Sequence, residues 1–119
     1  MACMLSAAML MLPLSALAEA PLSFAKSVQP ILDANCLQCH KPGGIGYERS
    51  GLDMRSYAGI MKGTKYGKVI LPGESYNSVL VQLIEHRANP TISMPFHKQS
   101  LTPAEIATIT RWIDEGAKP

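Results

Sequence analysis

The sequence contains few aromatic residues and few cysteines, and neither sign of charge is in large excess. Aromatic residues make up 6% of the 119-residue chain, and 11 basic residues are nearly balanced by 9 acidic ones, for a formal net charge of +2. No basic run stands out, which argues against a nucleic-acid-binding protein. Internal repeats, low-complexity tracts and a convincing strand pattern are also missing. The length suits one domain with a modest core.

The longest uncharged stretch, residues 1–18, is rich in Ala, Leu and Met and ends in the Ala-x-Ala form Ala16-Leu17-Ala18. This pattern predicts a secretory signal peptide cleaved after Ala18, although the positive charge that usually opens such a segment is absent. A transmembrane anchor is the alternative, but the stretch is slightly short and contains a proline. The sequence therefore predicts a mature domain over residues 19–119 that is periplasmic, without stable membrane insertion.

Cleavage would leave Cys36 and Cys39 as the cysteines of the mature chain, in the stretch NCLQCHK. A disulfide between them would close a loop too short to constrain the unfolded chain much. A thiol–disulfide oxidoreductase would need a strand-then-helix unit around the pair, which the flanking sequence does not resemble. A zinc site would need a second ligand pair at similar spacing, and His86 and His97 lie eleven residues apart.

Covalent haem attachment is the remaining interpretation, since His40 directly follows the second cysteine. Two thioether bonds would fix Cys36 and Cys39 to neighbouring edges of one macrocycle, and the helical turn between them would bring His40 under the iron as its proximal ligand. The motif alone occurs by chance in many proteins. Behind a signal peptide, with no other mature cysteine, it is a strong indication, and we expect one haem c per chain.

A low-spin electron-transfer haem needs a second axial ligand, for which methionine and histidine are the usual choices. Met54 and Met61 lie among apolar neighbours and are expected to be packing residues. Met94 lies in a polar loop, NPTISMPFHKQS, where the proline after it favours an extended backbone. The loop and the upstream haem motif favour Met94, with His97, His86 or an open sixth position as the alternatives.

Apolar periodicity and capping signals predict the first helices. One begins after Ser23, which is a plausible N-cap, and should end or kink at Pro30. Residues 41–51, with four glycines and a proline, are expected to form a loop, and residues 56–63 a short helix. Residues 64–75 should be extended and rich in turns.

Two further helices are predicted later in the chain. Residues 75–86 have Ser75 as a candidate N-cap and an apolar stripe of Val79, Leu80, Leu83 and Ile84. The final helix has the strongest signals, because Thr102 and Glu105 form a capping box and Gly116 suits the position after the helix. Its apolar face consists of Ile106, Ile109, Trp112 and Ile113.

These elements predict an all-α protein of three to four helices with long loops. So few helices bury little apolar surface, and a covalently held haem would act as the missing part of the core.

Several stretches together resemble class I c-type cytochromes: VQPILDANCLQCH, SGLDM, ILPGESYNSVL, SMPF and LTPAEIATITRWIDEGA. They look most like the bacterial monohaem cytochrome domains of the planctomycete-type group, and the resemblance covers residues 22–117. It implies a cytochrome c fold wrapped around one haem. It also implies that the N- and C-terminal helices cross and pack, with Phe24 or Val28 against Trp112.

For the haem site, the resemblance implies thioether bonds at Cys36 and Cys39, His40 as the proximal ligand and Met94 as the distal ligand. Tyr66, Lys65 and Arg55 are candidates for hydrogen bonds to the haem propionates. A basic docking rim for an acidic partner would consist of Lys62, Lys65, Lys68 and Lys98. An ordinary solvated surface is the alternative for both sets.

The sequence thus predicts a monomeric, periplasmic one-electron carrier rather than an enzyme, because a six-coordinate haem leaves no open position for a substrate. Its redox partner proteins would be a donor dehydrogenase or membrane complex and an acceptor oxidase or reductase. The alternatives are a haem-based sensor or ligand-binding module with a labile distal ligand, a small peroxidase using His97, and a cytochrome subunit of a larger oxidoreductase.

Overall fold

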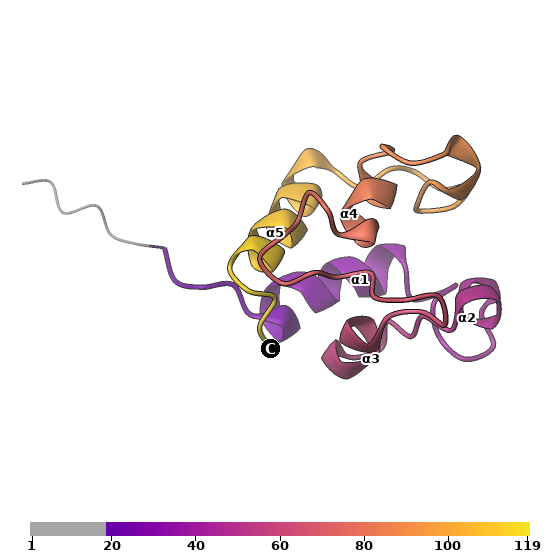
Figure 1. The fold of residues 1–119 in the computed structure, drawn as a ribbon, viewed down its shortest axis with the longest axis horizontal. Helices are drawn as coiled ribbons and strands as arrows, with labels where there is room; N and C mark the ends of the chain where they lie inside the picture. Colours follow the sequence, from indigo (N-terminus) through magenta and orange to yellow (C-terminus); the bar gives the residue numbers. More distant parts are fainter. Residues whose placement is uncertain (1–18) are drawn as a thin grey trace, which may run out of the picture.

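The computed structural model describes residues 19–119, and the signal peptide predicted for residues 1–18 lies outside them. Short helices joined by long loops make up the described chain (Figure 1). In order, they are η1 (Phe24–Val28), α1 (Gln29–Asn35), α2 (Ile45–Ser50), α3 (Tyr57–Lys62), α4 (Val79–Ile84), η2 (Pro90–Ile92) and α5 (Pro103–Asp114). Residues 19–119 hold no strand beyond one isolated bridge, which confirms the all-α class. None of the described helices has the length and apolar character needed to cross a bilayer.

The first helix begins after Ser23 as predicted, since the Ser23 hydroxyl accepts a hydrogen bond from the Lys26 amide. The helix does not end at Pro30. It changes from a π register in η1 to an α register in α1, and the Gln29 amide donates to the Phe24 carbonyl five residues back. Because Pro30 has no N–H to donate, the wider register just before it accommodates the missing bond.

The segment of residues 41–51 is not the loop that the glycines predicted, because it contains α2. The glycines mark the ends of this helix. Gly44 is extended before it, and Gly51 follows it with φ 75°, a left-handed conformation that favours glycine. The next two predictions are confirmed, with α3 running between a Ser56 N-cap and Gly63 and an irregular segment following it.

Helix α4 is shorter than predicted, and its N-cap residue is Ser78 rather than Ser75. Ser75 is instead bonded to Asp114 at the end of α5, its amide to Oδ1 at 3.1 Å and its hydroxyl to Oδ2 at 2.9 Å. The residues between Ser75 and Ser78 form a turn. Of the predicted apolar stripe, Leu80 and Ile84 are buried, whereas Val79 is 41% exposed.

Helix α5 confirms its predicted capping at both ends. The Thr102 hydroxyl accepts from the Glu105 amide, and the Glu105 carboxylate accepts from the Thr102 amide. At the other end Gly116 has φ 109°, and the Gly116 and Ala117 amides donate to the carbonyls of Ile113 and Trp112. This pair of bonds is a Schellman motif.

The core lies where the first helix meets α5 (Figure 1). Trp112 is fully buried, and its ring centroid lies 5.4 Å from that of Phe24. Tyr57 of α3 completes the group with an edge-on contact to each ring. The contact of Phe24 with Trp112 expected between the terminal helices is confirmed.

Candidate cofactor site

A cavity of about 650 Å³ opens in the half of the molecule away from this aromatic cluster. Its size falls within the roughly 300–1,000 Å³ typical of small-molecule and cofactor sites. In Figure 1, the segments that line it lie on one side at the end of α1 and in α2, and on the other in α4 and the loop that follows it. Apolar side chains predominate, and none of the lining residues in the described chain is acidic.

Backbone hydrogen bonds after α1 hold the Cys-x-x-Cys-His residues at the wall of this cavity. The Cys36 amide continues the helix by donating to the Leu32 carbonyl, and the Cys39 and His40 amides both donate to the Cys36 carbonyl, at 3.2 and 3.1 Å. The chain therefore curls through the helical turn that the spacing predicted. Cys36, Cys39 and His40 all line the cavity.

No disulfide joins Cys36 and Cys39 in the structure. Burial raises the pKa of the Cys36 thiol to about 11. That is the opposite of the lowered pKa that activates the thiolate of an oxidoreductase. Within residues 19–119, no group of three or more His, Cys, Asp or Glu side chains could hold a metal ion in the manner of a zinc site.

His40 is 8% exposed, and its Nδ1 atom is buried without a hydrogen-bond partner in the described chain. Burial lowers the pKa of the imidazole, and the backbone of Leu52 opposes this by a weaker amount. The neutral ring is therefore favoured, and neutral imidazole is the form that coordinates a metal. A buried, neutral imidazole beside two thiols on an apolar wall fits the donor set that a covalently bound haem requires.

Met94 also lines the cavity, and its amide donates to the Leu83 carbonyl at 3.2 Å, which fixes the loop to the end of α4. Neither alternative histidine is among the lining residues. His86 is bonded to Ser100, and the ring of His97 lies against that of Phe96.

The other two methionines take different positions. Met61 packs against the core and does not line the cavity. Met54 is buried in the core, as expected for a packing residue, but it also lines the cavity. Its amide donates to the His40 carbonyl at 2.8 Å, so Met54 is tied to the His40 side of the cavity, whereas Met94 is tied to α4.

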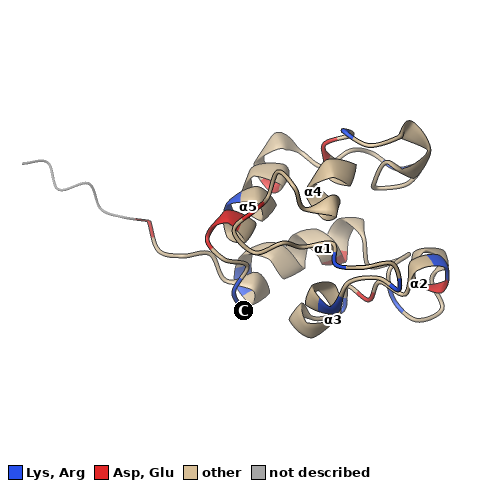
Figure 2. Cartoon of the chain, viewed as in Figure 1, with Lys and Arg blue, Asp and Glu red and all other residues tan. Residues whose placement is uncertain are grey.

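Charged residues of both signs are spread over the chain, with basic residues on α2 and α3 (Figure 2). Of the predicted basic rim, Lys68 and Lys98 line the cavity, and Lys62 and Lys65 do not. Arg49 of α2 also lines the cavity, and the sequence did not indicate this residue because its segment was predicted to be a loop. Each of these three cations could meet an anionic group at the cavity.

Of the three candidates for hydrogen bonds to the haem propionates, one lines the cavity and two do not. Tyr66 lines the cavity and is 81% exposed. The Lys65 ammonium instead lies 5.2 Å from the centroid of the Tyr66 ring. Arg55 pairs with Asp53 through two nitrogens, at 3.0 and 2.7 Å, which leaves its guanidinium occupied away from the cavity.

The helical fold and the Cys-x-x-Cys-His turn on an apolar cavity together define the class of the c-type cytochromes. A family model described as planctomycete cytochrome C matches residues 36–95, and the chain belongs to this family. Membership implies a covalently bound haem c and an electron-transfer role. The resemblance noted from the sequence is thereby confirmed.

One relative is the hydrazine synthase subunit alpha of Kuenenia stuttgartiensis, 30% identical over 121 residues. The match covers 80% of this chain but 15% of that subunit, so the chain spans a small part of the relative's length. No solved structure matches the chain.

Proposed function

We propose that this chain is a one-electron carrier whose single haem c is held by Cys36, Cys39, His40 and Met94. The observation that carries the proposal is that these four residues line one apolar cavity, although they come from segments more than fifty residues apart. The family match supports the cofactor, and the buried neutral imidazole supports His40 as an iron ligand.

When bound, the haem supplies a couple between ferrous and ferric iron. The chain supplies the rest. The side chains of Cys36 and Cys39 would anchor the cofactor, His40 would provide a nitrogen ligand to the iron, and the thioether of Met94 would provide a second ligand that favours the ferrous state. The apolar wall lowers the local dielectric and limits access of water.

The cations at the cavity suggest how partners are recognised. Among residues 19–119, the side chains of Arg49, Lys68 and Lys98 line the cavity and no acidic side chain does. Complementary charge speeds encounter between redox proteins, so we propose a donor and an acceptor with acidic docking faces. We place this exchange in the periplasm, with residues 19–119 as the mature monomeric domain.

A second candidate is a cytochrome subunit of a larger oxidoreductase. It is favoured by the relative, which is a subunit of hydrazine synthase and contains a stretch similar to most of this chain. A stable complex that survives purification from the native source would favour the subunit, and recovery of the chain alone would favour the free carrier.

The proposal is tested with protein made in a host that has haem-attachment machinery. We expect a mass increase of one haem and a reversible one-electron wave in voltammetry. The double variant Cys36→Ala, Cys39→Ala should show neither, and Cys39→Ala alone should retain haem through one thioether. A wild-type protein without haem, or one whose couple is irreversible, would contradict the proposal.

A further inference from the structure

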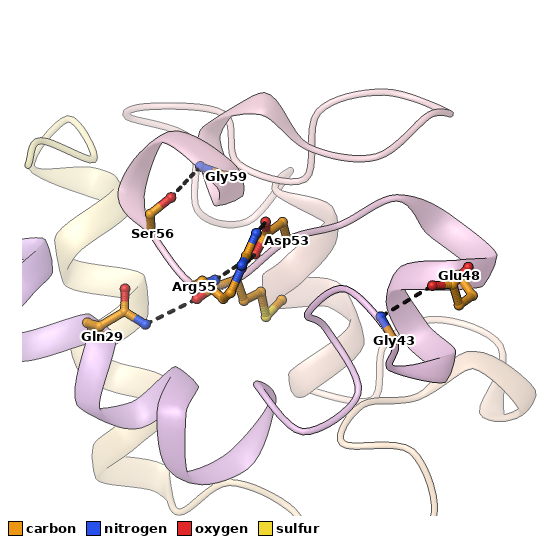
Figure 3. A network of polar contacts seen from close by, with 8 residues as sticks. Gln29, Gly43, Glu48, Asp53, Arg55, Ser56 and Gly59 are labelled. Atoms are coloured by element: carbon orange, nitrogen blue, oxygen red, sulfur yellow. Dashed lines mark hydrogen bonds and ion pairs between the residues drawn. The ribbon is translucent and has the colours of Figure 1, made fainter.

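The two walls of the cavity are fixed to different degrees. The wall that carries the Cys-x-x-Cys-His turn has hydrogen bonds to the segment that follows it. The Tyr47 amide of α2 donates to the Cys39 carbonyl at 2.8 Å. Figure 3 shows a second bond of this kind, in which the Gly43 amide donates to a carboxylate oxygen of Glu48 at 3.3 Å. The attachment turn is therefore held against α2 by its own neighbours in the sequence.

The loop that carries Met94, residues 89–100, is attached mainly to the other wall. The Met94 amide donates to the Leu83 carbonyl at 3.2 Å, and the Ser100 hydroxyl is bonded to the His86 ring at 3.0 Å. Both contacts lead to the end of α4. Two large apolar side chains of the loop are 50% exposed, so packing adds little to its attachment. What holds this loop, named here the Met94 loop, toward the haem motif must be sought elsewhere.

Lys98 makes that contact. Its ammonium donates to the side-chain oxygen of Gln38 at 2.8 Å, although the two residues are 60 positions apart. Gln38 lies between the two cysteines of the motif, and Lys98 lines the cavity. Among the described residues, no other hydrogen bond joins the Met94 loop to residues 36–40. The Lys98–Gln38 bond therefore connects the two walls of the cavity.

We propose that Lys98 and Gln38 are positioning residues that keep the Met94 loop closed against the haem motif, a role that rests on the proposed ligation of iron by Met94. The bond forms only while the loop lies against the opposite wall, so it stabilises the closed arrangement relative to any open one. An external ligand reaches the iron only after the Met94 sulfur has moved away. The bond thus lowers the fraction of the protein that can bind such a ligand. It favours an electron carrier over a sensor.

The test measures the apparent dissociation constant of imidazole for the ferric, haem-loaded protein from the change in its visible spectrum. Lys98→Met removes the donor, and Gln38→Leu removes the acceptor while keeping the charge of Lys98. The lysine variant leaves the motif intact, so it remains informative if Gln38→Leu attaches less haem. Gln82→Leu is the matched control, because Gln82 does not line the cavity and its amide donates to the nearby Asn77 carbonyl at 3.4 Å.

We expect the apparent dissociation constant of imidazole to fall about three- to tenfold in each single variant, as for the loss of one hydrogen bond. The double variant Lys98→Met, Gln38→Leu should show no more than the larger single change, because both substitutions remove the same contact. Gln82→Leu should match wild type.

Three results would overturn the inference alone. One is an imidazole affinity that stays at the wild-type value while only the melting temperature falls, which would make the contact merely structural. The others are a change in Lys98→Met without one in Gln38→Leu, which would point to charge, and additive changes in the double variant. A wild-type ferric spectrum without methionine ligation is a separate result, which would overturn the proposed function and this inference together.

Discussion

The two halves of the molecule differ in what fills them. Around Phe24 and Trp112, side chains from the first helix, α3 and α5 bury one another almost completely. Around the cavity, Ile45 and Ile92 are lining residues yet remain 59% and 50% exposed. Helices α2 and α4 span six residues each, too few to be stable alone in water. The first half is thus complete as a side-chain core, and the second has the composition of a core that a cofactor completes.

The largest effect should follow from preventing attachment of the haem. In the double variant Cys36→Ala, Cys39→Ala we expect amide protection in α2 and α4 to fall by about a hundredfold or more, because the apolar cavity would face water. Protection in the middle of α5 should fall much less. Hydrogen exchange followed by mass spectrometry measures both halves in one sample. Equal protection of α2 and α4 with and without haem would contradict the view that the cofactor completes this half of the molecule.

Truncating the side-chain core should have the next largest effect. Trp112→Ala removes the centre of the aromatic cluster and the Nε1–H bond to the Lys118 carbonyl, so we expect a loss of about 3–5 kcal/mol in the free energy of unfolding. Denaturant titration of the haem-loaded protein measures it. The haem spectrum of the folded variant should match wild type, and a changed spectrum would mean that the two halves are not separate.

A smaller effect is expected at the start of α5. Thr102→Ala removes the N-cap acceptor and should cost about 1 kcal/mol of stability. Thr108→Ala is the control, since Thr108 is in the same helix and its hydroxyl only donates back to the Ala104 carbonyl. Thermal unfolding of both variants checks the prediction, and equal losses would show that the cap is not the cause.

The smallest expected effect is on the loss of stability at low pH. The Thr102 amide, with a lesser contribution from Asn35, holds the pKa of Glu105 below its ordinary value of 4.5. A lowered folded-state pKa gives stability that is present above the unfolded value and is lost as pH falls through the folded value. Stability measured from pH 6 downward should therefore fall less in Glu105→Gln than in wild type. Parallel curves would refute this role for Glu105.

The sequence predicted what local chemistry determines. The capping box of α5, the Ser23 N-cap and the haem motif each lie within a few neighbouring residues, and the structure bears out the two caps and the turn of the motif. The contact between Phe24 and Trp112 came from the family resemblance, because the two residues are far apart in the chain.

The failures have causes in tertiary structure. Glycines that looked like breakers flank α2, and Gly46 lies inside the helix because the His40 ring packs where its side chain would be. Ser75 does not cap α4, because it binds Asp114, 39 residues away. The sequence did not predict that Arg49 and Met54 line the cavity, because the cavity is formed by segments that are far apart in the chain.

The most direct test of the central claim is the visible spectrum of the ferric protein for wild type, Met94→Ala and Met54→Ala. Met54 is the matched control, because it lines the same cavity from the His40 side. We predict the weak far-red band of methionine sulfur on ferric iron in wild type and Met54→Ala, with loss of the band and binding of carbon monoxide in the ferrous form for Met94→Ala. A wild-type protein that lacks the band and binds carbon monoxide readily would contradict His40–Met94 ligation and favour a sensor or an enzyme.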